Sequence, residues 1–217
     1  MILYDLCCSF GSEIWKQAAH KQKMELRTYT SAMMDTPQKK QQILKDIQKA
    51  SQNGKVVLLF SSHGMDKELE DFFKILPTNI CVLPIGADAI LLNRGSVDAK
   101  HVTRINEYQS YSGEENVFRM MAYIRKYLFE DPTAPIPLEP IKMPFDGIYS
   151  LVNNQVYYDI SSFLEAQDKK FDIYVGMLSH RSSWLNQNLQ VESSLIEALN
   201  QINIGVIPVF SSGEKSE

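Results

Sequence analysis

The segment Lys55–Phe60, with the sequence KVVLLF, constrains the fold most, because every position after the lysine is apolar. A strand with one wet face alternates apolar and polar residues, whereas a central strand of a parallel sheet is apolar on both faces. We therefore expect this segment to be a central strand of a parallel sheet that is covered by helices on both faces.

Strand and helix patterns alternate on either side of this segment. Ser12 and the pair Thr36-Pro37 are helix-start signals, and Asn53-Gly54 is a helix-end signal. Further strands are predicted at Met1–Cys8, Met24–Thr30 and Ile80–Ile85. This order predicts an α/β fold with a Rossmann-like or flavodoxin-like parallel-sheet domain over residues 1–130.

Residues 86–112 carry a weaker pattern. Turns are indicated near Gly86 and Gly95, and Val102–Tyr108 is interpreted as a short strand or irregular structure. Ser112 with Glu115 three residues later has the form of a capping box, which predicts that a helix begins there. The apolar face predicted for this helix consists of Val117, Met120, Met121, Ile124, Tyr127 and Leu128.

Five of the nine prolines fall between Pro132 and Pro144, which excludes a helix or a central strand. We expect an extended connector over residues 131–147. A second α/β domain is predicted to begin at residue 148, with strands at Phe171–Leu178 and Gly205–Phe210 around a helix at Val191–Asn203. Because this unit would need more strands to bury both faces, residues 148–217 are expected to be the truncated beginning of that domain.

Composition excludes several classes of protein. Lys and Arg number 22 against 26 Asp and Glu, so a net charge of −4 gives no electrostatic footprint for nucleic acid or anionic membrane. No apolar run approaches the ~20 residues that span a bilayer. The three cysteines, Cys7, Cys8 and Cys81, form no disulfide framework, so a cytoplasmic location is expected.

Common catalytic and nucleotide-binding motifs are absent from the sequence. There is no G-x-x-x-x-G-K-[ST] loop, no G-x-G-x-x-G turn and no G-x-S-x-G elbow. The histidines are scattered, so no metal site is predicted. His63 and His180 differ from the others because each follows the carboxyl end of a predicted strand, where ligands of α/β sheets gather. His63 is therefore a possible loop-site residue, and no catalytic residue is assigned.

The stretch Val175–Asn188 contains the most chemically informative residues. His180, Arg181, Trp184 and Asn188 follow a predicted strand. Arginine offers a planar fork for carboxylates and tryptophan a flat apolar surface, and both suit a flat macrocycle with carboxylate or amide side chains. The alternative is structural: Arg181 would make an internal ion pair, and Trp184 would pack against the following helix.

The chain resembles the family of cobaltochelatase and magnesium chelatase large subunits. The resemblance covers about 100 residues. It begins at Tyr111–Asn116 and ends with the run Gly176–Phe210, in which Ser179-His180 and Gln187 depart from the family pattern. The matching residues in that run are Gly176, Arg181, Ser182, Trp184, Leu185, Asn188, Leu195, Ile196, Leu199, Pro208, Val209 and Phe210.

This resemblance implies that the chain is the N-terminal part of a much longer subunit. Such subunits bind a tetrapyrrole, and with separate AAA+ ATPase and adaptor subunits they drive ATP-dependent insertion of cobalt or magnesium. The sequence of the run Gly176–Phe210 resembles the cobalt-inserting branch of the family more than the magnesium-inserting branch. The resemblance to the cobalt branch implies a role in cobalamin synthesis. The chain alone is expected to bind no cofactor and to lack chelatase activity, and His180, Arg181, Trp184 and Asn188 become candidates for a tetrapyrrole-facing or domain-interface loop.

Two other functions remain open from the sequence. The chain could be a non-catalytic docking module that binds the partner subunits and never touches a tetrapyrrole. It could also be a free-standing small-molecule-binding protein of flavodoxin-like architecture, although it lacks a phosphate loop.

Overall fold

The structure is a computed structural model that describes residues 1–7, 12–61, 71, 73–77, 79–86, 89, 93, 96–185 and 188–212. The chain divides into two compact units, which we call unit 1 (Met1–Ile141) and unit 2 (Lys142–Glu217). The division falls inside the proline-rich connector. Each unit is described by itself.

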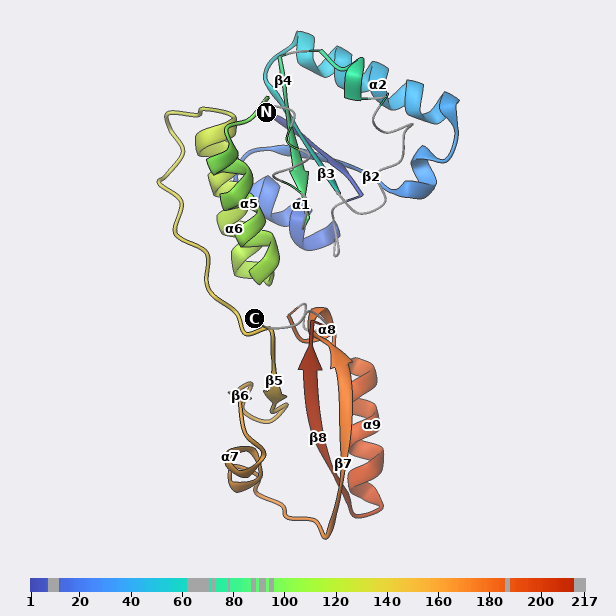
Figure 1. Ribbon diagram of the computed structural model, residues 1–217, viewed down its shortest axis with the longest axis vertical. Helices are drawn as coiled ribbons and strands as arrows, with labels where there is room; N and C mark the ends of the chain where they lie inside the picture. Colours follow the sequence, from blue (N-terminus) through green and yellow to red (C-terminus); the bar gives the residue numbers. More distant parts are fainter. Residues whose placement is uncertain are drawn as a thin grey trace. The chain divides into compact units, whose positions relative to one another are not determined.

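Unit 1 contains a four-stranded, fully parallel sheet with the strand order β2-β1-β3-β4, as the apolar strand patterns predicted (Figure 1). Because β1 has β2 on one side and β3 on the other, the chain switches direction across the sheet at β1 and β3, as in doubly wound folds. The strands are β1 (Ile2–Leu6), β2 (Glu25–Tyr29), β3 (Val56–Ser61) and β4 (Ile80–Ile85).

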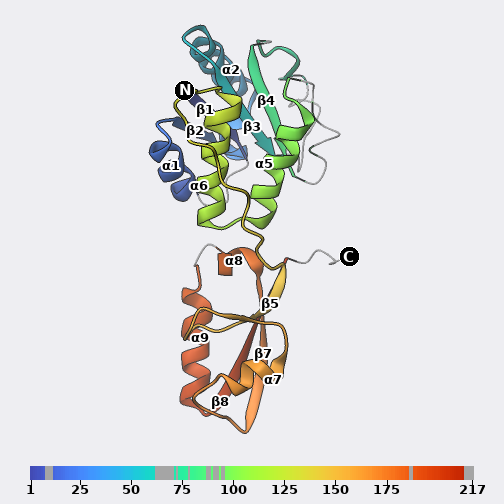
Figure 2. The ribbon, with the colours of Figure 1, turned by 90° about the vertical axis from the view of Figure 1, so that its left-hand side faces the viewer.

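Helices cover both faces of this sheet. Helices α1, α5 and α6 pack on one face and α2 packs on the other, an arrangement that Figures 1 and 2 both show. Their bounds are α1 (Ser12–Lys21), α2 (Pro37–Gln52), α5 (Ala99–Tyr111) and α6 (Glu114–Tyr123), with a short 3₁₀ helix η1 (Ser31–Met34) and a π-helical turn η2 (Ile124–Leu128) that continues α6.

The predicted central strand is β3, and it is buried on both faces. Val57 and Leu59 join the core under α1, α5 and α6, while Leu58 and Phe60 join the core under α2. The alternation follows from the two-residue repeat of side chains along a strand. The α/β fold class predicted from this segment is therefore confirmed.

The start of α2 follows the sequence signal. The Thr36 side chain accepts a hydrogen bond from the Lys39 N–H at 3.4 Å, and Pro37 occupies the first turn. Proline costs nothing there, because the first helical N–H groups have no partner within the helix.

The interpretation of residues 102–112 is wrong in two respects. Val102–Tyr108 lies in helix α5, where Asp98 accepts a hydrogen bond from the Lys100 N–H at the helix start. Ser112 does not cap α6: it ends α5 with a φ of 54°, and Gly113, with a φ of 82°, precedes α6. Two successive positive φ angles turn the chain sharply between the helices, and this conformation suits glycine at the second position.

Unit 2 is a smaller mixed α/β unit with the strand order β6-β5-β8-β7. Strands β7 and β8 are parallel and joined through α9, while β5 is antiparallel to both β8 and β6. The predicted strand-helix-strand core is present, and the antiparallel return of β5 was not foreseen. The elements are β5 (Asp146–Tyr149), β6 (Val156–Tyr157), α7 (Ile160–Glu165), β7 (Ile173–His180), α8 (Arg181–Leu185), α9 (Gln190–Gln201) and β8 (Ile204–Ser211).

Candidate functional site: the Arg181 turn and the anchored connector

Arg181 begins α8, directly after the last residue of β7. Its side chain is buried, with 6% of its surface exposed, and points to the end of the connector. Nε donates to the Pro144 carbonyl at 2.6 Å and Nη2 donates to the Met143 carbonyl at 3.3 Å. The guanidinium also lies 4.7 Å from the centre of the Phe145 ring. Arg181 therefore binds the end of the connector to the turn that follows β7 in unit 2.

Trp184 packs inside the same unit. Its ring is stacked on Phe210 of β8, with centroids 4.3 Å apart and planes inclined by 12°. Phe210 is fully buried, and the centre of its ring lies 6.2 Å from the centre of the Tyr149 ring on β5. The stacking ties the α8 turn to the two central strands of the unit.

His180 and Asn188 differ from these two residues because both are exposed. The Nδ1 atom of His180 accepts a hydrogen bond from the Ser182 N–H at 3.1 Å and lies 2.7 Å from the Ser182 hydroxyl. Since Nδ1 is an acceptor, the neutral ring carries its proton on Nε2. The Asn188 N–H donates to the Ser183 carbonyl at 2.9 Å.

The four residues predicted for this loop thus form an inward pair, Arg181 and Trp184, and an outward pair, His180 and Asn188. The inward pair makes contacts within unit 2, and the side chains of the outward pair are exposed. The fifth predicted residue, His63, lies outside the described residues.

The connector is fixed to unit 1 by side chains that sequence analysis did not single out. Asn116 of α6 donates to the Ile141 carbonyl and accepts from the Ile141 N–H, both at 2.8 Å, as a neighbouring strand would. The Tyr108 hydroxyl donates to the Leu138 carbonyl at 2.6 Å. Proline has no N–H and cannot join a ladder, so side-chain donors supply what a sheet would supply.

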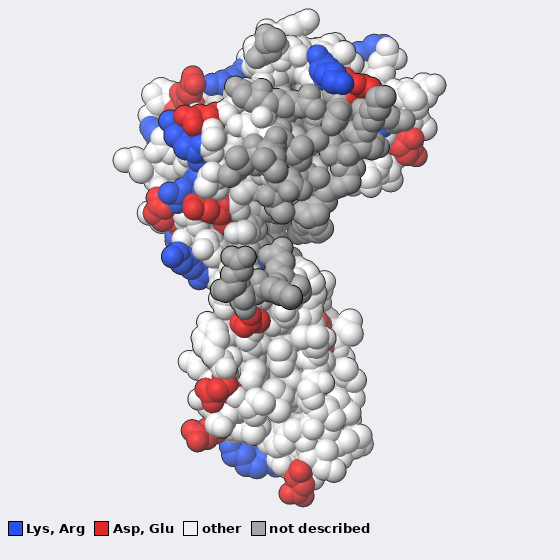
Figure 3. Space-filling view, viewed as in Figure 1, with Lys and Arg blue, Asp and Glu red and all other residues white. Residues whose placement is uncertain are grey.

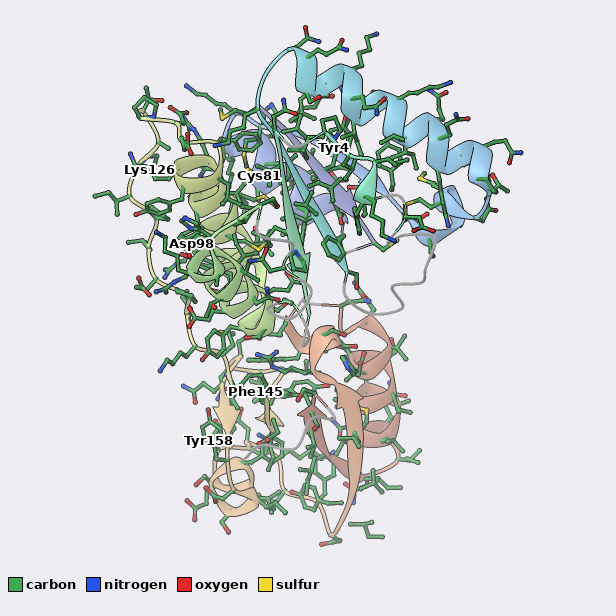
Figure 4. The ribbon with its side chains drawn as sticks, turned by 45° about the horizontal axis from the view of Figure 1, so that its top comes forward. Tyr4, Cys81, Asp98, Lys126, Phe145 and Tyr158 are labelled. Atoms are coloured by element: carbon green, nitrogen blue, oxygen red, sulfur yellow. The ribbon has the colours of Figure 1, made fainter. Side chains whose placement is uncertain are left out.

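Charged residues fasten the start of the connector in the same way. Arg125 Nε donates to Asp131 at 2.8 Å, and Arg125 Nη2 donates to the Thr133 hydroxyl at 3.0 Å. Lys126 reaches the Ala134 carbonyl at 3.1 Å; its place on the last turn after α6 is labelled in Figure 4. The sequence signal for this arrangement was the position of these cations, just before the prolines.

The anchors leave one position between them. Asn116 holds Ile141, and Arg181 holds Met143 and Pro144, whereas Lys142 is exposed. The chain segment that joins the two units is thus held by side chains on either side of Lys142.

A second polar cluster lies in unit 1 between β2 and α2. Asp46 accepts hydrogen bonds from Arg27 at 2.8 Å, from Tyr4 at 2.9 Å and from Tyr29 at 3.1 Å. Burial raises the pKa of Tyr4, and the hydrogen bond to Asp46 adds to this effect. All three donors to Asp46 are side chains of the same unit. We therefore interpret the cluster as structural: it fixes α2 to the edge strand β2.

Metal-ligating side chains do not gather in the part of the chain that the structure describes, where no group of three or more His, Cys, Asp or Glu could hold an ion. Burial raises the pKa of the Cys7 and Cys81 thiols, which keeps both as neutral thiols. Over the same described ranges, no helix has the length and apolarity needed to cross a membrane.

Comparison with known proteins places these features in a family context. Residues 106–217 match the family described as CobN/Magnesium Chelatase, which is just over half of the chain. The matched region begins inside α5 and takes in all of α6, the connector and unit 2. The chain matches no curated protein sequence.

A solved structure has a similar fold. It is the catalytic subunit of cobaltochelatase from Mycobacterium tuberculosis, with a TM-score of 0.52 and 15% sequence identity over 97% of this chain. The match covers 16% of that subunit, so this chain spans about a sixth of its length.

Proposed function

Because the chain belongs to the CobN/magnesium chelatase family, we propose that it forms part of the large, tetrapyrrole-binding subunit of an ATP-dependent metal chelatase. The family match over residues 106–217 carries this proposal. The favoured reaction is insertion of cobalt into a corrin precursor of cobalamin, and insertion of magnesium into a protoporphyrin is the alternative. Cytoplasmic location is part of the same proposal.

The proposed contribution of this chain is binding and positioning, without bond-making chemistry. Metal insertion requires a base that removes the pyrrole protons and ligands that deliver the metal. We assign neither role to a described residue. ATP would be bound by separate AAA+ subunits, as the resemblance to chelatase large subunits implies.

Within the Arg181 turn, we assign the roles by exposure. His180 and Asn188 are exposed, so they are the candidates that would face a tetrapyrrole side chain. Arg181 and Trp184 hold the turn in place through Pro144 and Phe210. A polar pair on a turn that Arg181 and Trp184 anchor is suited to a carboxylate or amide of the macrocycle.

The second candidate function is a docking module for the AAA+ and adaptor subunits. The observation that favours it is the inward position of Arg181, whose charge is committed to main-chain carbonyls of its own unit. In this case the exposed turn would contact protein and not tetrapyrrole.

A titration separates the two functions. The chain is titrated with a corrin or a porphyrin, and the visible or Soret band is followed. Tetrapyrrole binding predicts a saturable band shift that is weakened several-fold in His180→Ala and Asn188→Ala and unchanged in Asn153→Ala, a substitution on an exposed turn of unit 2. Absence of a shift at high micromolar ligand, together with binding of the AAA+ subunits, would favour the docking function.

A further inference from the structure

One edge of the sheet in unit 2 is long and open. Among the residues that the structure describes, strand β7 ends the order β6-β5-β8-β7 and pairs along all eight residues with β8 alone. Edge strands in natural proteins are usually short, charged, interrupted by proline or covered, because their free main-chain groups attract other strands. The β7 sequence IYVGMLSH contains no lysine, acidic residue or proline.

The other three sheet edges of the described chain all carry such protection. β6 has only two residues. At the β4 edge, the Ser96 hydroxyl accepts from the Val82 N–H at 3.0 Å and donates to the Val82 carbonyl at 2.9 Å. β2 carries Glu25 and Arg27, and the arginine is paired with Asp46. The β7 edge therefore differs from the other three edges, because it carries none of these forms of protection.

The side chains of β7 are apolar on both faces of the sheet. Ile173 and Leu178 point to opposite faces and are 60% and 75% exposed. Val175 is also among the exposed large apolar residues. A nearly continuous apolar strand is typical of an internal position in a parallel sheet, as β3 shows in unit 1. The sequence of β7 thus suits a strand with neighbours on both sides.

Helix α9 has a second apolar stripe that the described residues of unit 2 leave exposed. Its inward side includes Ile196, which borders the same small cavity as Val206 and Pro208 of β8. The stripe, which is defined by Val191, Leu195, Ala198 and Ile202, follows helical spacing on another side. Val191 is 79% exposed and Ile202 is 66% exposed, and none of the residues of α9 is buried.

Charge is scarce around both features. From Phe171 to Ser212 the only charged residues are Asp172, Arg181, Glu192 and Glu197. Figure 3 shows the face of unit 2 turned to the viewer as largely free of Lys, Arg, Asp and Glu. Depletion of charge together with exposed apolar side chains is the composition of the centre of a protein interface.

We infer that the β7 edge and the α9 stripe dock a further strand-and-helix segment of a chelatase large subunit. The strand adds to β7, and the helix packs beside α9 over the added strand, which continues the layering of an α/β sheet. The similar solved subunit supplies the argument for this occupant: its match to this chain leaves 84% of that polypeptide as further protein (100 − 16). The inference rests on the proposed function.

The first test uses binding. The chain is mixed with the remaining portion of the chelatase large subunit from the same genome, produced separately, and the affinity is measured by calorimetry. Leu178→Lys combined with Val191→Lys should weaken binding at least tenfold, because two charges would be buried without partners. Val152→Lys, an equally exposed apolar position of unit 2, should bind as the unchanged chain does. All variants should keep the original unfolding temperature, since each altered side chain is exposed.

The second test uses the chain alone and in the complex. Main-chain amides of β7 that do not pair with β8 should exchange with deuterium rapidly in the free chain and at least tenfold more slowly in the complex. Slow exchange of these amides in a monomeric free chain, or equal binding by the double variant, would overturn the inference. A homodimer that the double variant dissociates would assign the surface to a second copy and would also overturn it.

These outcomes are separable from the proposed function. The same proteins are titrated with the corrin or porphyrin. A tetrapyrrole band shift without docking overturns only this inference, whereas docking without a band shift counts against tetrapyrrole binding by the chain and leaves the interface standing.

Discussion

Arg181 Nε donates a 2.6 Å hydrogen bond to the carbonyl of Pro144, so the first residue after β7 holds the last proline of the connector. The sequence pattern favoured Arg181 as a cation for an anionic ligand or as a partner in an ion pair. In the structure its fork reaches two main-chain carbonyls and an aromatic ring. The Met143 and Pro144 carbonyls lie in the proline-rich connector, outside a helix or strand, so they need donors from side chains. Arginine supplies several donors from one side chain.

We predict that Arg181→Ala destabilises unit 2 by about 3 kcal/mol, because it removes charge-assisted hydrogen bonds from a buried side chain to the Met143 and Pro144 carbonyls. Arg181→Lys should lose much of the same stability, since an ammonium cannot reproduce the planar fork. The measurement is urea unfolding followed by Trp184 fluorescence in a Trp15→Phe background. The neighbouring exposed substitution His180→Ala is the control and should change the free energy of unfolding by less than about 0.5 kcal/mol. Equal stability of Arg181→Ala and the control would contradict the anchoring role.

A second prediction concerns the opposite side of Lys142. Asn116 pairs with both main-chain groups of Ile141, so Asn116→Ala should free the end of the connector from α6. Cleavage by trypsin after Lys142 should then become about tenfold faster, because the rate follows the population of the released segment. Timed digestion with mass spectrometry measures this rate. Asn153→Ala should leave it unchanged, and so would Asn116→Ala if the connector were held elsewhere.

Burial and period made the strands of this chain predictable, and β3 is the clearest case. Its apolar side chains belong to two cores, and this is a property of a central parallel strand that sequence alone reveals. The sequence did not predict helix α5 although Val102, Ile105 and Tyr108 follow helical spacing, because the apolar pattern is short and directly follows the turn signal at Gly95. Ser112 and Glu115 have the spacing of a capping box, but the residue at the N-cap of α6 is Gly113.

The roles of the site residues were less predictable for a different reason. Whether Arg181 points inward or outward depends on where Met143 and Pro144 lie, nearly forty positions earlier in the chain. Trp184 depends likewise on Phe210. The residue types indicated which interactions were possible, whereas packing between distant parts of the sequence determined which groups Arg181 and Trp184 contact.

The start of the connector should respond to acid. The Thr133 hydroxyl and the Arg125 guanidinium hold the pKa of Asp131 at about 2. Because the folded pKa lies below the unfolded value of about 3.9, the stability from this carboxylate is fully present above about pH 4 and is lost as the pH falls toward 2. Comparing the urea unfolding of Asp131→Asn and the unchanged chain across this range checks the sign. The difference in free energy between them should shrink as the pH falls, and a constant difference would contradict the assignment.

Trp184 offers a probe that separates structure from ligand binding. Its stacking on Phe210 at 4.3 Å should make Trp184→Ala destabilising by about 2 kcal/mol, because a large aromatic contact is lost from a partly exposed site. Trp184→Phe keeps an aromatic partner and should recover about half of that loss. The chain has one other tryptophan, Trp15, which is buried in unit 1, so the fluorescence of Trp15→Phe reports unit 2 alone. If Trp184 served mainly as a macrocycle platform, Trp184→Ala would weaken tetrapyrrole binding while leaving the unfolding midpoint of unit 2 unchanged. The stacking geometry predicts the reverse: the midpoint falls, and in the folded protein at low temperature the affinity for the tetrapyrrole changes less than twofold.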